Sequence, residues 1–408
     1  MISFAQWVIK ELDIKMYNTD LFFLDNGRYI SDNKLLIKKI TEFLKLKKAQ
    51  DNELMYQLTK LSDEIDASLK ELPILLRNGS IVDGEYVPPS ETIPFTPFYL
   101  DVEYNASAFD EHVDKFLNSI TCDSKGEDPA PRKELRQTLE EILGHILLTN
   151  KFPAHVFFLS GGGNNGKSTF LEMINNFVGE LGQNLSLDAF NDGTSVATLN
   201  AKLVNCSDET DDVFIDRCKG YKSLASGNTI TVRPIYSQPV KVQNTATLIL
   251  SANKMPEFKD KSKGFFRRLM IIPFDFVITE KISNLDELLS TDNAKSYILK
   301  LALKGVQSIK ANGYKMTENK YLNEKIDEYI LDTDTVASYL AEKDTKIENR
   351  RTTEVHKAYC LYCMDIGKMS LGLSRFSSRL KDFGYYSTPV SNPNKNSKDK
   401  TIRVYKKG

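Results

Sequence analysis

The stretch "FFLSGGGNNGKST", Phe157–Thr169, decides the fold of this 408-residue chain. It matches the pattern G-x-x-x-x-G-K-[ST], in which glycines let backbone N–H groups curl around a phosphate at a helix N-terminus. The apolar run "HVFFLS" leads into the loop and a helical pattern follows it, which is the context that such a loop requires. The residues predicted to hold a nucleotide are Gly161, Gly162, Gly163, Asn164, Asn165, Gly166, Lys167, Ser168 and Thr169.

The loop and the next strand pattern predict a site for ATP and Mg²⁺. Lys167 is expected to contact the β- and γ-phosphates, and the Ser168 hydroxyl to ligate Mg²⁺. The pattern "AKLVNCSDE" ends in Asp208, expected in the metal's shell, and in Glu209, expected to polarise the attacking water. The run "DETDD" also offers Asp211 and Asp212 for the water, and the sequence leaves that choice open.

Two further strand patterns bring polar residues to their ends. "TATLILSAN" ends at Asn253, which either senses the γ-phosphate or is a turn residue. "RRLMIIPF" begins with Arg267 and Arg268. They are either a surface pair or supply an arginine to the γ-phosphate of a neighbouring subunit. Strands that alternate with helices predict an α/β domain with a largely parallel sheet.

The patterns on either side of this core predict smaller modules. "LFFLDNGRYIS" (Leu21–Ser31) predicts a hairpin, and helices are expected over Asp32–Leu46 and Asp51–Lys70. "GNTITVRPIYSQPVKV" (Gly227–Val242) predicts a second hairpin. Near the C-terminus, two helical patterns and two strand arms predict a winged-helix domain.

Composition narrows the class of protein. The five cysteines follow no disulfide pattern and no apolar run approaches the length of a membrane span, so we expect a soluble cytoplasmic protein without a membrane partner. The net charge is −1, but residues 51–150 hold 8 Lys/Arg against 20 Asp/Glu, whereas residues 351–408 hold 12 against 4. The basic tail is therefore expected to meet an anion.

The order and spacing of "GGGNNGKST", "LVNCSDE", "YKSLASGNTITVRPIY", "LILSANKMP" and "FFRRLMIIPF" resemble superfamily 3 DNA helicases. The phage and plasmid primase-helicases are the most similar, with the poxvirus-type enzymes as relatives. The resemblance runs from about Leu75 to Gly408. It implies a bacterial host, a mobile genetic element, and an AAA+ ring, expected to be a hexamer, that moves along single-stranded DNA and opens forked duplex.

The resemblance also assigns roles to residues. Lys167, Ser168, Asp208, Glu209 and Asn253 would form the ATPase site, and Arg268, with Arg267 as a second choice, the arginine finger. The segment "TITVRPIY" looks like the hairpin that holds single-stranded DNA in the ring channel. The candidate DNA contacts there are Arg233, Tyr236 and Lys241, with Lys222 before the hairpin. "RPIYS" departs from the Lys or His that the family carries at the hairpin tip.

The basic tail offers a second DNA surface. Arg375 and Arg379 are four residues apart on a predicted helix, and "NPNKNSKDK" adds Lys395, Lys398 and Lys400. This set is either a solvated basic face or a contact to duplex DNA at an origin. His356, Cys360 and Cys363 share a helix face without a fourth ligand, so core packing is the favoured interpretation.

The predicted architecture is therefore an α/β, AAA+ P-loop ATPase core with an N-terminal α+β/helical region and a C-terminal winged helix. The boundaries are 1–125 (α+β module), 126–152 (helical collar), 153–280 (core), 281–345 (helical connector) and 346–408 (winged helix). We find no primase pattern, so a separate or fused primase is an expected partner. Two other functions stay open, an origin-binding initiator that uses ATP only to assemble, and a small-molecule P-loop kinase.

Overall fold

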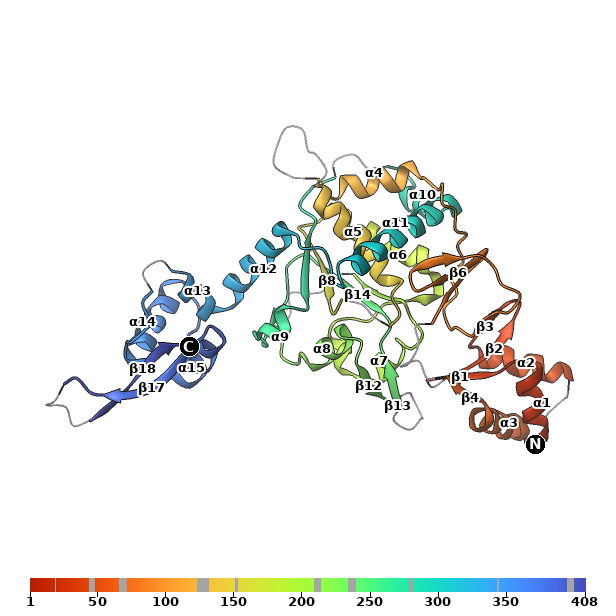
Figure 1. Cartoon of the computed structure of the whole chain (residues 1–408), viewed down its shortest axis with the longest axis horizontal. Helices are drawn as coiled ribbons and strands as arrows, with labels where there is room; N and C mark the ends of the chain where they lie inside the picture. The colour runs from red at the N-terminus through yellow and green to blue at the C-terminus, as the bar shows by residue number, and fades with distance from the viewer. Residues whose placement is uncertain are drawn as a thin grey trace. The chain divides into compact units, whose positions relative to one another are not determined.

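The computed structural model describes residues 1–18, 20–43, 48–65, 72–122, 132–150, 153–208, 214–233, 240–278, 282–342, 345–394 and 400–408. The chain forms two compact units (Figure 1). Unit 1 comprises Met1–Lys259 and Arg268–Asn319, and unit 2 comprises Asp260–Arg267 and Lys320–Gly408.

A five-stranded sheet forms the centre of unit 1, with the strand order β16-β8-β14-β10-β9 and parallel pairing throughout. Its inner strands are apolar runs buried on both faces, as is usual where helices cover a parallel sheet. Helix α6, Lys167–Val178, packs against β10 and β14. The strands are β8 Val156–Ser160, β9 Gly182–Gln183, β10 Val204–Ser207, β14 Thr247–Ala252 and β16 Leu269–Pro273.

Short elements connect these strands. A two-stranded antiparallel hairpin, β12–β13, leaves the core after α8, and a second small pair, β11–β15, is parallel. The connecting elements are the 3₁₀ turns Gly179–Leu181 and Asp188–Asn191, α7 Gly193–Ala197, β11 Phe214–Ile215, α8 Lys219–Ala225, β12 Thr229–Val232, β13 Val240–Gln243 and β15 Glu257–Phe258.

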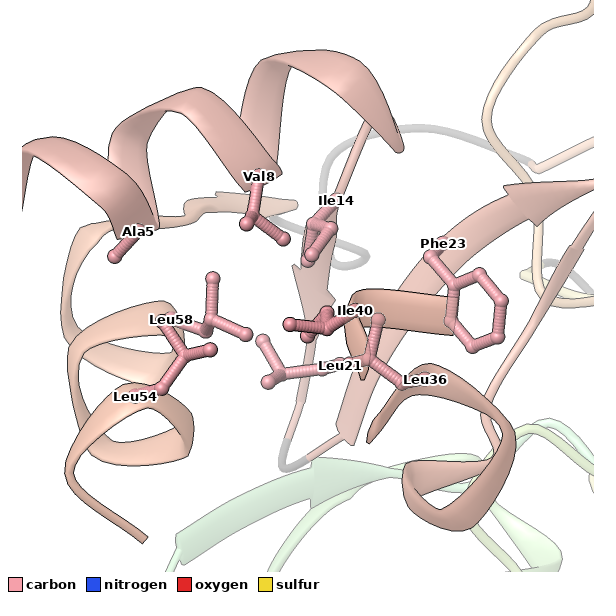
Figure 2. Packing of buried hydrophobic residues seen from close by; sticks show 9 residues of the cluster. All are labelled: Ala5, Val8, Ile14, Leu21, Phe23, Leu36, Ile40, Leu54 and Leu58. Carbon is pink, nitrogen blue, oxygen red and sulfur yellow. The ribbon is translucent and has the colours of Figure 1, made fainter. Parts of the chain in front are cut away.

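The N-terminal module has its own core, in which α1 and α3 lie against a four-stranded sheet, β3-β2-β1-β4. Figure 2 shows Ala5 and Val8 of α1 near Leu54 and Leu58 of α3. The elements are α1 Ile2–Glu11, β1 Lys15–Tyr17, β2 Asp20–Asp25, β3 Arg28–Ile30, α2 Asn33–Phe43, α3 Lys48–Leu61 and β4 Asp63–Ile65.

Two predictions fall in this module. The hairpin is confirmed as β2–β3, whose turn residues Asn26 and Gly27 have φ values of 47° and 80°, as a tight hairpin requires. The helix predicted over Asp51–Lys70 is wrong at its end, because α3 stops at Leu61 and β4 pairs in parallel with β1. That pairing gives the β4 backbone its hydrogen-bond partners in the sheet.

Unit 1 also contains a small antiparallel sheet, β5-β6-β7, and a helical layer in which α5 packs along α11 (Figure 1). The two helices approach closely at Gly144 and Gly305. A Cβ on Gly305 would lie 2.0 Å from the carbonyl oxygen of Glu140, so only glycine fits there. The elements are β5 Ile74–Leu76, β6 Gly79–Val82, β7 Glu85–Val87, α4 Glu111–Ser119, α5 Lys133–Ile146, α10 Leu285–Leu289 and α11 Asp292–Ala311.

Unit 2 contains a three-helix cluster, α13 to α15, closed by the antiparallel ribbon β17–β18. Its core includes Val336, Tyr359, Phe376, Leu380 and Tyr405. The predicted order of two helices and two strand arms is confirmed, and α13 adds a third helix. The elements are α9 Lys263–Phe266, α12 Lys320–Thr333, α13 Thr335–Ala341, α14 Thr352–Asp365, α15 Leu373–Asp382, β17 Tyr385–Ser391 and β18 Thr401–Lys407.

Candidate functional site

The glycine-rich loop joins β8 to α6 at the carboxyl edge of the central sheet. Gly163 and Gly166 have φ values of 105° and 83°, where a side chain would strain the backbone. A Cβ on Gly162 or Gly163 would meet nothing within 4 Å, so space lies beside the loop. Ser168, in the first turn of α6, is exposed. The loop is therefore shaped to accept an anion at a helix N-terminus.

The side chains of Lys167 and Asn165 form hydrogen bonds that hold the loop in its conformation. The Lys167 ammonium donates to the carbonyl oxygen of Gly161 at 2.6 Å and to Oδ1 of Asn165 at 3.0 Å. Nδ2 of Asn165 donates to the carbonyl oxygen of Phe274, just past β16, at 2.8 Å. Both side chains are buried, with 5% and 3% exposed. The acceptors on Gly161 and Asn165 are neutral, and a charged phosphate would be a stronger partner for the ammonium than either of them.

Asp208 and Asn253 lie at the same edge of the sheet as the loop. Asp208 directly follows β10, whose last residue, Ser207, is opposite Leu250 of β14. Asn253 directly follows β14, whose last residue, Ala252, is opposite Ser160 of β8. Both side chains are exposed. The strand order thus places Asn253 between the loop and Asp208. Glu209, Asp211 and Asp212 lie outside the described residues.

Arg268 lies at the opposite, amino edge of the sheet, and Arg267 directly precedes it in the chain. The backbone N–H of Val156, the first residue of β8, donates to the carbonyl oxygen of Arg268 at 2.7 Å. Since β16 runs parallel to β8, Arg268 is separated from the loop by the length of the strand, roughly 16 Å. Arg267 is exposed, whereas Arg268 is half-buried and donates through Nε to Ser226 Oγ at 2.9 Å.

The predicted hairpin is confirmed as β12–β13. Its cross-strand pairs place Thr231 and Lys241 on an exposed face, and Val232 and Val242 are buried. Arg233 is exposed and follows β12 directly, toward the turn. Lys222 is half-buried in α8. Tyr236 lies outside the described residues.

The predicted cations of the tail lie in different environments. Arg375 is exposed on α15, whereas only 13% of the Arg379 side chain is exposed. Arg379 donates through Nε to Asp334 Oδ2 at 2.7 Å and through Nη1 to Asp382 Oδ2 at 2.6 Å. Lys400 is exposed, and Lys395 and Lys398 lie outside the described residues. The ribbon adds three exposed cations that the sequence patterns did not single out: Arg403, Lys406 and Lys407.

Three of the four histidines lie in environments that indicate a structural role. Burial lowers the pKa of His145 and of His155 to about 4. His145 hydrogen-bonds with Thr247 of β14 and with the carbonyl oxygen of Pro153, which ties α5 to the sheet. His356 hydrogen-bonds with the carbonyl oxygen of Leu371. Within the described residues, no group of three or more His, Cys, Asp or Glu side chains is arranged to hold a metal ion.

Residues of α4, α5 and α11 line a pocket of about 470 Å³, and no residue of the glycine-rich loop is among them. Two of its three lining cations contact carboxylates: Arg136 pairs with Asp114 and Glu140, and Lys304 pairs with Glu140. None of the lining residues belongs to the strand ends described above.

For the described residues, we also find that no helix is both long and apolar enough to cross a bilayer.

This chain is similar in sequence or in structure to several known proteins. Residues 159–268 match a protein family described as "Family of unknown function (DUF5906)". An Acanthamoeba polyphaga mimivirus protein named "Putative helicase L207/L206" is 24% identical over 190 residues, which are 43% of this chain and 18% of that protein. The apo structure of the NrS-1 C-terminal region has a TM-score of 0.53 at 14% identity and covers 98% of both chains. A structure of its residues 305–718 has a TM-score of 0.51 and covers 99% of both.

These matches confirm the resemblance that the motifs indicated. The chain is a distant homologue of the mimivirus protein, and it shares the fold of the NrS-1 region along nearly its whole length. It spans less than a fifth of the mimivirus protein.

Proposed function

We propose that the protein is an ATP-dependent replicative DNA helicase of a mobile genetic element. In this proposal it assembles as an AAA+ ring, a hexamer, and moves along single-stranded DNA. The observation that carries the proposal is the division of the site between two edges of one sheet. The loop, Asp208 and Asn253 meet at the carboxyl edge, and Arg268 lies at the amino edge, where its own loop is out of reach. A site that needs all four is complete only between neighbouring subunits.

The residues at the carboxyl edge fit ATP and Mg²⁺. The open space at Gly162 and Gly163 admits a phosphate, and Lys167 supplies a cation beside it. The exposed Ser168 hydroxyl and Asp208 carboxylate are the oxygen ligands that Mg²⁺ prefers. The metal would neutralise charge on the phosphates. Asn253 would contact the γ-phosphate, and one of the acids from Glu209 to Asp212 would orient the water.

The hairpin β12–β13 is the proposed grip on single-stranded DNA. Arg233 and Lys241 are exposed on it and present no pattern for reading bases, which suits a sequence-independent, salt-sensitive contact with phosphates. The name of the mimivirus relative supports a helicase rather than a small-molecule kinase. An origin-binding initiator without processive unwinding is the second candidate, and the cations of unit 2 are the observation that favours it.

Unwinding of a forked DNA by the wild-type protein tests the proposal. Arg233→Ala is expected to reduce strand displacement about tenfold, because a charge-assisted contact with a phosphate contributes about 1.5–3 kcal/mol. Arg217→Ala removes an exposed arginine outside the hairpin and is the matched control. If the wild type hydrolyses ATP but displaces no strand over a range of salt concentrations and fork shapes, the initiator replaces the helicase.

We also propose that unit 2 is a winged-helix domain that docks on duplex DNA, with α15 as the helix nearest the groove. Helices α13 to α15 followed by the ribbon β17–β18 support this proposal, as do the exposed cations Arg375, Lys400, Arg403 and Lys406. Such contacts are dominated by phosphates. A primase, separate or fused, is the proposed protein partner.

Arg375 and Arg379 are expected to differ, although they are four residues apart on one helix. Arg375→Ala should leave the free energy of unfolding unchanged. It should make the plot of log duplex affinity against log salt concentration less steep by about one unit of slope, as the loss of one phosphate contact does. Arg379→Ala should lower the free energy of unfolding by about 3 kcal/mol, because it leaves the carboxylate of Asp334, 4% exposed, without its cation. Titration with duplex DNA and chemical denaturation measure the two effects.

Arg375→Lys keeps the charge and is the control for the first variant. If Arg379→Ala is as stable as the wild type and loses duplex affinity instead, then Arg379 contacts DNA directly and the structural role is wrong.

A further inference from the structure

Ser226 forms a hydrogen-bonded bridge between Arg268 and helix α8. Its hydroxyl accepts from Arg268 Nε at 2.9 Å and donates to the carbonyl oxygen of Lys222, one helical turn earlier, at 2.9 Å. One hydroxyl can do both, since it has one proton and two lone pairs. The backbone of Arg268 is fixed at the sheet by its bond from Val156. The bridge therefore links the proposed arginine finger to the last turn of α8.

The last turn of α8 leads directly into the DNA hairpin (Figure 1). Ser226 caps the helix, and Gly227 follows with a φ of 59°. The N–H of Gly227 donates to Leu224, and that of Asn228 donates to Ser223. This is the pattern of a Schellman motif, which fixes the direction of the chain that leaves a helix. Strand β12 then begins at the next residue, so a movement of the helix end would also move the strand.

The other strand of the hairpin is tied to the same helix end. Asn244 directly follows β13 and is buried. Its Nδ2 donates to the carbonyl oxygen of Leu224 and to that of Ala246, both at 3.0 Å. Both ends of the hairpin are thus anchored on one helical turn, and Ser226 connects that turn to Arg268.

We propose that Ser226 is a positioning residue that couples the nucleotide of one subunit to the DNA hairpin of the next. The inference rests on the proposed function, in which Arg268 reaches into the neighbour's ATPase site. To do so, the guanidinium has to turn away from Ser226, which gives it two arrangements. With Arg268 on Ser226, the helix end and the hairpin are held against the sheet. With Arg268 on the neighbour's γ-phosphate, that restraint is released.

This bridge makes nucleotide binding and DNA binding depend on each other. A nucleotide that draws Arg268 away favours the released hairpin, and DNA that binds the released hairpin frees Arg268 for the nucleotide. Linkage requires the two effects on affinity to be equal in size. Such coupling changes an affinity by about 5–150-fold. The measurable quantity is the ratio of single-stranded DNA affinities with and without a non-hydrolysable ATP analogue.

The experiment measures this ratio for the full chain with a fluorescent oligonucleotide. In the wild type, the analogue is expected to raise the affinity for DNA, so that the ratio is above one. Ser226→Ala is expected to lower this ratio by about fivefold or more, until it approaches one. Ser226→Thr keeps the hydroxyl and should keep the wild-type ratio. Arg268→Ala removes the other end of the bridge and should lower the ratio alike. A double variant, Ser226→Ala with Arg268→Ala, should then lose nothing further, as expected for two residues that act through one contact.

The outcomes separate this inference from the function on which it rests. A wild-type ratio of one would remove the coupled ring helicase itself, and the inference with it. A clear wild-type ratio that Ser226→Ala preserves would overturn the role of Ser226 and leave the helicase in place. The same holds if Ser226→Thr fails as Ser226→Ala does while both variants unfold at the wild-type temperature, because the hydroxyl would then be irrelevant. Should Ser226→Ala not fold, Arg268→Ala tests the bridge from its other end.

Discussion

Lys167→Ala is expected to reduce ATP hydrolysis by about 10²–10³-fold, which is the usual cost of removing one positioned donor from a developing negative charge. The ammonium is held inside the loop by Gly161 and Asn165, beside the space at Gly162 and Gly163. Alanine leaves the loop without its cation at that point. Phosphate release at saturating ATP, with single-stranded DNA present, measures the effect.

A matched lysine supports the interpretation. Lys219, like Lys167, is the first residue of a helix, but it is exposed on α8 and far in sequence from the loop. Lys219→Ala should hydrolyse ATP at the wild-type rate. If Lys167→Ala keeps more than about half of the activity, the loop does not hold the reacting phosphate. The thermal unfolding of both variants shows whether a loss reflects chemistry or folding.

The sequence predicts the centre of the fold well, because the inner strands of a parallel sheet are buried on both faces. Such strands are continuous apolar runs between polar loops. The patterns ending at Ser160, Asp208 and Asn253 thus correspond to β8, β10 and β14. Their order in the sheet follows from no local pattern. It is the strand order that places Asn253 between the loop and Asp208.

Short or exposed elements escape such patterns. Strand β9 has two residues and β4 has the sequence Asp-Glu-Ile, so neither shows an apolar run. Their pairing is decided by neighbours far along the chain. Helical periodicity also does not predict that Arg379 forms an ion pair while Arg375 is exposed. The spacing of four places both on one side of a helix, but Asp334, 45 residues before Arg379, decides that only Arg379 is engaged.

The hydrogen bond between Arg268 and Ser226 was likewise not predictable from a local pattern. Its two residues are 42 positions apart, and no motif joins them. One local signal was present, since "ASGN" carries the Gly that commonly follows a helix end. It predicts where α8 stops. It does not predict that the capping serine faces an arginine at the edge of the sheet.

Arg268→Ala is expected to reduce ATP hydrolysis by about 10³-fold, the lower end of the effect of an arginine finger. The position of Arg268 makes a stronger test possible than the loss of activity. Since it lies at the amino edge of its own sheet, it should serve only a neighbour's loop. Subunits with Arg268→Ala keep an intact loop, and subunits with Lys167→Ala keep an intact finger. When the two inactive variants are mixed, a complete site forms at each interface where the loop comes from an Arg268→Ala subunit and the arginine comes from a neighbouring Lys167→Ala subunit.

In an equal, random mixture about one quarter of the interfaces combine an intact loop with an intact finger, because each side is intact in half of the subunits and the ring has one direction. If the sites act independently, ATP hydrolysis should therefore return to about one quarter of the wild-type rate per subunit. If neighbouring sites must hydrolyse ATP in sequence, the recovered rate should be lower. Arg267→Ala provides the neighbouring arginine as a control. A mixture as inactive as its components would place Arg268 and Lys167 in the same subunit's site, and wild-type hydrolysis by Arg268→Ala alone would remove the finger altogether. Recovery in the mixture has one simple explanation: the phosphate loop of one chain and the arginine of the next form a single catalytic site.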